Sequence, residues 1–122
     1  MVEKNKKTIL AIDDEMSVQE SMKLLFEDEY NIITTGSVKE SFGIIKKQKI
    51  DLVLLDIRMP EMWGVEVLKK IKEINEDIKV IMVTAVYNIE TGVDALSYGA
   101  HDYVVKPFDV QELKERVKQL IG

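Results

Sequence analysis

The stretch Asp51-Leu52-Val53-Leu54-Leu55-Asp56 decides the fold of this chain of 122 residues. Four apolar residues without a polar break predict a strand over 51–55 that is buried on both faces. Such strands belong to parallel sheets that are covered by helices. A carboxylate directly after the strand then lies at the carboxyl edge of the sheet, where open α/β sheets bind their ligands. Asp56 is therefore the first candidate for a functional residue.

Shorter β-rich runs and amphipathic segments alternate on both sides of this strand. The other strands are predicted at 8–12, 31–34, 79–83 and 102–105. Helices are predicted at about 17–27 and 89–98, and after Ser37, Gly64 and Asp109. Ser37 with Glu40, and Asp109 with Glu112, have the spacing of capping boxes, and Gly99 suits a helix C-terminus. Strict alternation with short loops predicts a doubly wound α/β fold with helices on both faces of a parallel sheet.

Composition narrows the class of protein. A hydrophobic content of 46% and a charged content of 32% predict one globular domain over residues 1–122. The net charge of −5 gives the domain no electrostatic reason to bind nucleic acid or anionic membranes directly. The chain has no cysteine, which excludes disulfides and thiolate metal sites. It has neither an apolar stretch of transmembrane length nor a signal-peptide pattern, so we expect a cytoplasmic protein.

Polar side chains follow four of the five predicted strands, and parallel strand ends meet at one edge. These residues are Asp13 and Asp14, Asp56, Thr84 and Lys106. Three carboxylates at one place repel and raise one another's pKa, and a hard cation such as Mg²⁺ removes that cost by binding their oxygens. A carboxylate can also attack phosphorus, and an ammonium and a hydroxyl can bind phosphoryl oxygens. The edge is therefore predicted to hold a divalent metal and a phosphoryl group.

Four sequence motifs stand at these strand ends. They are Ile-Asp-Asp-Glu at 12–15, Leu-Asp-Ile-Arg-Met-Pro-Glu-Met at 55–62, Val-Thr-Ala at 83–85 and Asp-Tyr-Val-Val-Lys-Pro-Phe at 102–108. In this order and spacing, the chain resembles the receiver domain of bacterial two-component response regulators over essentially its whole length. The resemblance implies a flavodoxin-like (βα)5 fold with strand order 2-1-3-4-5 and a cis bond before Pro107. It leaves open whether the receiver stands alone or is the N-terminal part of a longer regulator, and the ending at Gly122 slightly favours the latter.

The resemblance also implies the chemistry of the site. Asp56 would accept a phosphoryl group from the phosphohistidine of a sensor histidine kinase or a phosphotransfer protein. Asp14, Asp56 and the backbone carbonyl of Arg58 would ligate Mg²⁺, or Mn²⁺ in its place, and Asp13 would act through a bridging water. Such a domain catalyses only its own phosphorylation and dephosphorylation, so it is not expected to be an enzyme for other substrates.

The remaining implied roles concern the response to phosphorylation. Thr84, Lys106 and the backbone of Ala85 would bind phosphoryl oxygens, and Thr84 with Tyr103 would form the conformational switch. The output face would be the helix at 89–98, the strand at 102–105 and the last helix. On that face, Asp102 and Arg116 are predicted to form intersubunit ion pairs in a phosphorylation-dependent homodimer.

Arg58 and Val86 are predicted to make the phosphoryl group long-lived. In the family, the residues two beyond the phosphoacceptor and two beyond the threonine line the path of the hydrolytic water. Val86 cannot hydrogen-bond that water, and the Arg58 side chain can shield or pair with the phosphoryl group.

Two residues depart from the family pattern. Trp63 stands where Asp or Asn usually precedes Gly64. We expect a partly exposed tryptophan that packs on the loop, with a role in partner docking as the alternative. His101 stands where the family often has Asp, and it is expected to be an ordinary surface residue.

The sequence disfavours three other classes of protein. A phosphatase with an Asp nucleophile would need a second Asp two residues on, and Asp13-Asp14-Glu15 lacks that spacing. A flavodoxin-like redox protein would need a Gly-rich phosphate loop after the first strand, but the first glycine is Gly36. A receiver-like scaffold that acts by protein interaction without phosphorylation is disfavoured because all five polar residues are present.

Overall fold

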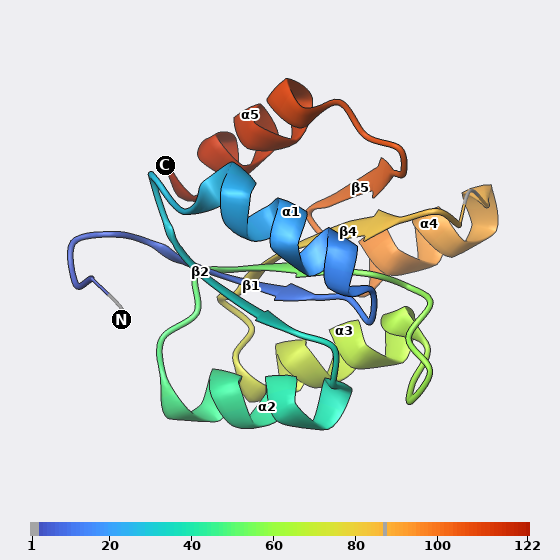
Figure 1. The fold of residues 1–122 in the computed structure, drawn as a ribbon. Helices are drawn as coiled ribbons and strands as arrows, with labels where there is room; N and C mark the ends of the chain where they lie inside the picture. The colour runs from blue at the N-terminus through green and yellow to red at the C-terminus, as the bar shows by residue number, and fades with distance from the viewer. Residues whose placement is uncertain (1–2, 87) are drawn as a thin grey trace.

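The computed structural model describes residues 3–86 and 88–122 (Figure 1). Five parallel strands form one sheet in the order β2-β1-β3-β4-β5, so the fold class and strand order that the sequence predicted are confirmed. The strands are β1 (Thr8–Ile12), β2 (Asn31–Thr35), β3 (Leu52–Leu55), β4 (Lys79–Thr84) and β5 (Asp102–Val105). The helices are α1 (Met16–Phe26), α2 (Val38–Lys47), α3 (Gly64–Ile74), α4 (Ile89–Ser97) and α5 (Val110–Ile121).

The sheet lies between two layers of helices. Helices α1 and α5 cover one face, and α2, α3 and α4 cover the other (Figure 1). Side chains alternate between the faces along each strand. In β1, Ile9 and Ala11 pack in the cluster that α1 and α5 close, whereas Leu10 and Ile12 pack in the cluster that the other helices close. The central strands are buried on both faces, as their unbroken apolar sequences predicted.

The helix ends follow the local signals in the sequence. The side chains of Ser37 and Asp109 accept hydrogen bonds from the amides of Glu40 and Glu112 at 3.1 Å and 2.9 Å, which is one half of each predicted capping box. Gly99 follows α4 with a φ of +105°, a left-handed conformation that favours glycine. No helix within the described ranges is both long enough and apolar enough to span a bilayer.

Strand register places the candidate residues level with one another. Ile12 of β1 is paired with Leu55 of β3, so the residues that follow them, Asp13 and Asp56, leave the sheet side by side. Thr84 is paired with Val105, and the amide of Lys106 continues the ladder to the Thr84 carbonyl at 2.8 Å. The carboxyl edge of the sheet therefore collects residues from β1, β3, β4 and β5.

Candidate functional site

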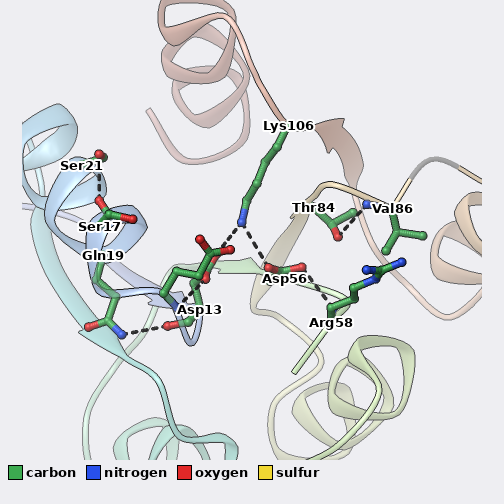
Figure 2. Close-up of polar contacts among 10 residues, drawn as sticks. Asp13, Ser17, Gln19, Ser21, Asp56, Arg58, Thr84, Val86 and Lys106 are labelled. Atoms are coloured by element: carbon green, nitrogen blue, oxygen red, sulfur yellow. Dashed lines mark hydrogen bonds and ion pairs between the residues drawn. The ribbon is translucent and has the colours of Figure 1, made fainter. Parts of the chain in front are cut away.

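Three charged side chains meet at this edge. The Nζ atom of Lys106 lies 2.7 Å from Asp13 Oδ2 and 3.1 Å from Asp56 Oδ2 (Figure 2). Asp13 and Asp56 are only 4% and 6% exposed. The convergence of Asp13, Asp56 and Lys106 that the sequence predicted is thus present, with one ammonium between two buried carboxylates.

The charges in this cluster do not balance. Burial raises the pKa of Asp13, and hydrogen bonds from Lys106 and from the Glu15 amide oppose that rise. Burial by itself lowers the pKa of Lys106, but the hydrogen bond and charge of Asp13, followed by those of Asp56, raise it overall. One positive charge faces two carboxylates, so the site favours a further cation.

Carboxylate oxygens of Asp13, Glu15 and Asp56 lie within 4.8 Å of one another. An all-oxygen set of this kind suits a hard divalent cation. Asp14, which the sequence predicted as a ligand, is exposed and lines a hollow of about 340 Å³ with Arg58, Met59, Pro60 and Trp63. Glu15 was not predicted. The only sequence feature that could have indicated Glu15 is its position next to Asp13 and Asp14. The Glu15 amide donates to Asp13 Oδ1 at 3.0 Å, and this hydrogen bond stabilises a turn of the chain.

The loop after Asp56 folds back on itself at once. The Arg58 amide donates to Asp56 Oδ1 at 3.1 Å, and Arg58 and Trp63 pair as an isolated antiparallel bridge. A Cβ on Gly64 would lie 2.4 Å from Ile57 Cα, so only glycine fits that position. Trp63 is 47% exposed, which confirms the expectation of a partly exposed side chain.

The predicted switch residues hold the segment after β4. Thr84 is fully buried, and its hydroxyl oxygen accepts from the Val86 amide at 3.2 Å. The Tyr103 hydroxyl donates to the Val86 carbonyl at 2.6 Å. Burial, and then the charge of Asp56, raise the pKa of Tyr103. Ala85 is exposed between these contacts. In the view of Figure 2, Arg58 and Val86 lie on the side of Asp56 away from Asp13.

Structure adds detail to three further predictions. The Lys106–Pro107 bond is cis, as expected. His101 is exposed, yet its Nδ1 accepts from the Val80 amide at 3.3 Å, and its own amide donates to the Val80 carbonyl at 2.7 Å. Arg116 pairs with Asp102 in the same chain, so these two residues already have a partner without a second subunit.

Comparison with known proteins identifies the family. Residues 9–118 match the model of the response regulator receiver domain. The chain belongs to the response regulator receiver family. It is 37% identical over 115 residues to the transcriptional regulatory protein ZraR of Escherichia coli K12, covering 93% of this chain and 26% of that protein. It is 33% identical to the sporulation initiation phosphotransferase F of Bacillus subtilis 168, covering 93% and 92% of the two chains.

A solved structure supports the same assignment. The CheY-like receiver domain protein from Methanospirillum hungatei JF-1 superposes with a TM-score of 0.90 at 32% identity, over 94% of this chain and 93% of that one. The receiver thus spans about a quarter of ZraR but nearly all of the Bacillus phosphotransferase. This chain is a receiver domain of two-component response regulators, a class that interacts with histidine kinases or phosphotransfer proteins.

Proposed function

We propose that this receiver accepts a phosphoryl group on Asp56 from the phosphohistidine of a sensor histidine kinase or phosphotransfer protein. The observation that carries the proposal is the buried Asp56 carboxylate, held by Lys106 beside Asp13 at the open edge of the sheet. The chemistry is limited to the domain's own phosphorylation and dephosphorylation. Its consequence is a change of conformation that controls an output.

The transfer is a substitution at phosphorus. A carboxylate oxygen of Asp56 forms the new O–P bond while the N–P bond to the donor imidazole breaks, and the electron pair of that bond stays on the departing nitrogen. The Lys106 ammonium lies 3.1 Å from Asp56. It can bind a phosphoryl oxygen during the transfer and stabilise the negative charge of the phosphoryl group on Asp56. Thr84 and the Ala85 amide, at the end of the neighbouring strand, would bind the other phosphoryl oxygens.

A divalent cation fits the acidic residues of the site. Asp13, Glu15 and Asp56 offer clustered carboxylate oxygens, and Asp14 and Arg58 line the adjoining hollow. Within this set we assign Asp14, Asp56 and the Arg58 carbonyl as direct ligands of Mg²⁺, and Asp13 as a ligand through water; Mn²⁺ suits the same oxygens. The cation supplies positive charge that lowers repulsion between the carboxylates and the incoming phosphoryl group.

The contacts of Thr84 and Tyr103 support a conformational switch at these two residues. When the Thr84 hydroxyl turns to the phosphoryl group, its bond with the Val86 amide breaks and the segment after β4 is released. Tyr103, whose hydroxyl donates to the Val86 carbonyl in this structure, would then fill the space that Thr84 vacates. Helix α4, β5 and α5 would carry the change to a partner or to a second copy of the chain.

We propose that residues 1–122 form a single receiver domain, whether or not it belongs to a longer regulator. We place it in the cytoplasm and assign it no direct binding to nucleic acid or membranes. A partner kinase, rather than a small molecule, is its expected phosphodonor in the cell.

Phosphorylation by acetyl phosphate, followed by intact mass, tests the assignment. We expect one added phosphoryl group in the wild type with Mg²⁺, and none with a chelator or in Asp56→Asn, because the amide is not a nucleophile. Asp77→Asn, at an exposed position on the opposite edge of the sheet, is the matched control and should be modified normally. Asp14→Ala should need more Mg²⁺. Full modification of Asp56→Asn would refute the proposal, and a folded wild type that is never modified would favour the scaffold alternative.

A further inference from the structure

The loop after the phosphoacceptor, residues 57–63, is closed at its base. Arg58 and Trp63 pair across it, and the Gly64 amide donates to the Ile57 carbonyl at 2.8 Å. These contacts leave Met59, Pro60, Glu61 and Met62 as the tip of a tight turn. The base of this loop directly follows Asp56, so the conformation of the loop affects the surroundings of that residue.

Glu61 connects this tip to the start of α2. Its Oε1 atom accepts a hydrogen bond at 2.9 Å from the amide of Val38, the first residue of that helix, 23 residues earlier in the chain. The first amides of a helix have no acceptor within the helix, and its N-terminus favours negative charge. Ser37 Oγ accepts from the Glu40 amide at 3.1 Å. Two side chains therefore cap α2, one from its own N-cap and one from the phosphoacceptor loop.

A series of contacts continues from Glu61 to Asp56. The bridge between Trp63 and Arg58 joins the two arms of the loop, and the Arg58 amide donates to Asp56 Oδ1 at 3.1 Å. A displacement of the tip therefore changes the orientation of the peptide that contacts the phosphoacceptor. The same peptide segment carries the Arg58 carbonyl that we assign to the metal.

Apolar and polar contacts hold different sides of the loop. Ile57 and Met59 are buried and belong to the same apolar cluster as Val38. Arg58, Pro60 and Glu61 are exposed. The inward side of the loop lies in the apolar cluster that also contains Val38, and the outward side is joined to α2 by the Glu61 carboxylate.

We propose that Glu61 is a positioning residue, which anchors the phosphoacceptor loop on α2 and so fixes the backbone of Arg58 at Asp56. Loss of this anchor loosens the loop base and weakens cation binding there. The part that concerns the cation rests on the proposed function, whereas the part that concerns the loop does not. Glu61 acts through backbone geometry and not by touching the phosphoryl group.

Three variants separate anchoring from simple helix stability. Glu61→Ala removes the acceptor, and Glu61→Gln keeps an acceptor oxygen without the charge. Ser37→Ala is the matched control, because it removes the other cap of α2 and leaves the loop untouched. Hydrogen exchange of the Arg58 and Gly64 amides, measured by NMR without metal, should become about two- to thirtyfold faster in Glu61→Ala, the range expected for loss of one cap. The increase should be smaller in Glu61→Gln, which keeps the acceptor oxygen but loses the favourable charge, and the rates should stay unchanged in Ser37→Ala.

Trp63 reports cation binding in the same variants. It is the only tryptophan of the chain and lies on this loop, so its fluorescence should follow a Mg²⁺ titration. We expect about fivefold weaker Mg²⁺ binding in Glu61→Ala, a smaller loss in Glu61→Gln and wild-type affinity in Ser37→Ala.

Each contrary result has a distinct meaning. Unchanged exchange in Glu61→Ala, or equal acceleration in Ser37→Ala, overturns the proposal. Mg²⁺ affinity that falls equally in Glu61→Gln overturns it too, because the charge would then act at a distance. A wild type that does not respond to Mg²⁺ contradicts the metal site of the proposed function, and the exchange rates then decide the role of Glu61 alone.

Discussion

Lys106 and Asp13 are 93 residues apart in the sequence, and their charged groups lie 2.7 Å apart at the carboxyl edge of the sheet. Lys106 also contacts Asp56, so a single ammonium compensates two buried carboxylates. Removing one partner of a buried ion pair leaves an uncompensated charge, which costs more than the pair itself contributes. We therefore expect Lys106 to contribute to stability in addition to its proposed role in phosphoryl binding.

Lys106→Met should therefore lower the free energy of unfolding by about 3 kcal/mol at neutral pH without metal. Mg²⁺ should reduce that loss, because a cation at the carboxylates replaces part of the missing charge. Urea unfolding with a chelator and with Mg²⁺ measures both effects. Lys114→Met is the control, since its ion pair with Glu29 is long, at 4.0 Å, and about half exposed. A loss that Mg²⁺ does not change would contradict the shared role of lysine and cation.

Val86→Glu and Arg58→Asn should each speed loss of the phosphoryl group by about tenfold, because each introduces a group that can orient the attacking water. Phosphate release from the phosphorylated protein with Mg²⁺ measures the rate. Val93→Glu places the same new charge on the exposed side of α4 and should leave the rate unchanged. If neither substitution accelerates hydrolysis, the lifetime is controlled elsewhere.

Beryllofluoride with Mg²⁺ should shift the receiver towards a dimer through α4, β5 and α5, as measured by sedimentation. Asp102 and Arg116 pair within one chain in this structure, and in the predicted dimer these pairs would be exchanged between subunits. Asp102→Arg and Arg116→Asp should each weaken self-association by at least about tenfold, because like charges then face each other.

Mixing those two variants provides the decisive control. In a mixed dimer, opposite charges face each other at both positions, so association should return only in the mixture. If association does not recover on mixing, Asp102 and Arg116 pair only within one chain and not between subunits. A monomer that beryllofluoride leaves unchanged at high concentration would point to a monomeric output.

The free energy of unfolding should decrease as the pH falls, because His101 is protonated. Burial, and then the charges of Lys72 and Lys79, hold the pKa of His101 below its ordinary value. As the pH falls through about 6.5, His101 is protonated in the unfolded chain but remains neutral in the folded chain. The free energy of unfolding therefore decreases until the pH reaches the lower pKa of the folded state. A protonated Nδ1 also cannot accept the hydrogen bond from the Val80 amide.

Urea unfolding at about pH 7 and pH 5.5 tests this prediction. His101→Asn removes the titrating group and should show a smaller loss of stability between these two pH values than the wild type. Equal losses in the two proteins would show that other groups control the acid side of the stability profile.

Local sequence patterns were sufficient to predict the strands, the starts of the helices and the family. The unbroken run from Leu52 to Leu55 can be satisfied only where both faces of a strand are covered, and Ser37 and Asp109 cap helices through contacts three residues away. Short-range patterns of this kind depend on backbone periodicity, which the sequence carries directly. The meeting of Asp13, Asp56 and Lys106 also followed, since parallel strands end at one edge.

Other features depended on how loops fold beyond the strand ends. Glu15 joins Asp13 and Asp56 while Asp14 lies at the rim, because a turn of the chain after Asp13 decides which side chain points inwards. The hydrogen bond of His101 to Val80 and that of Glu61 to Val38 join segments 21 and 23 residues apart. The sequence determined which residues reach the carboxyl edge, because strand periodicity and parallel pairing place them there. Only the tertiary structure decided which of them touch, because loop conformation and distant packing have no period that a sequence pattern can reveal.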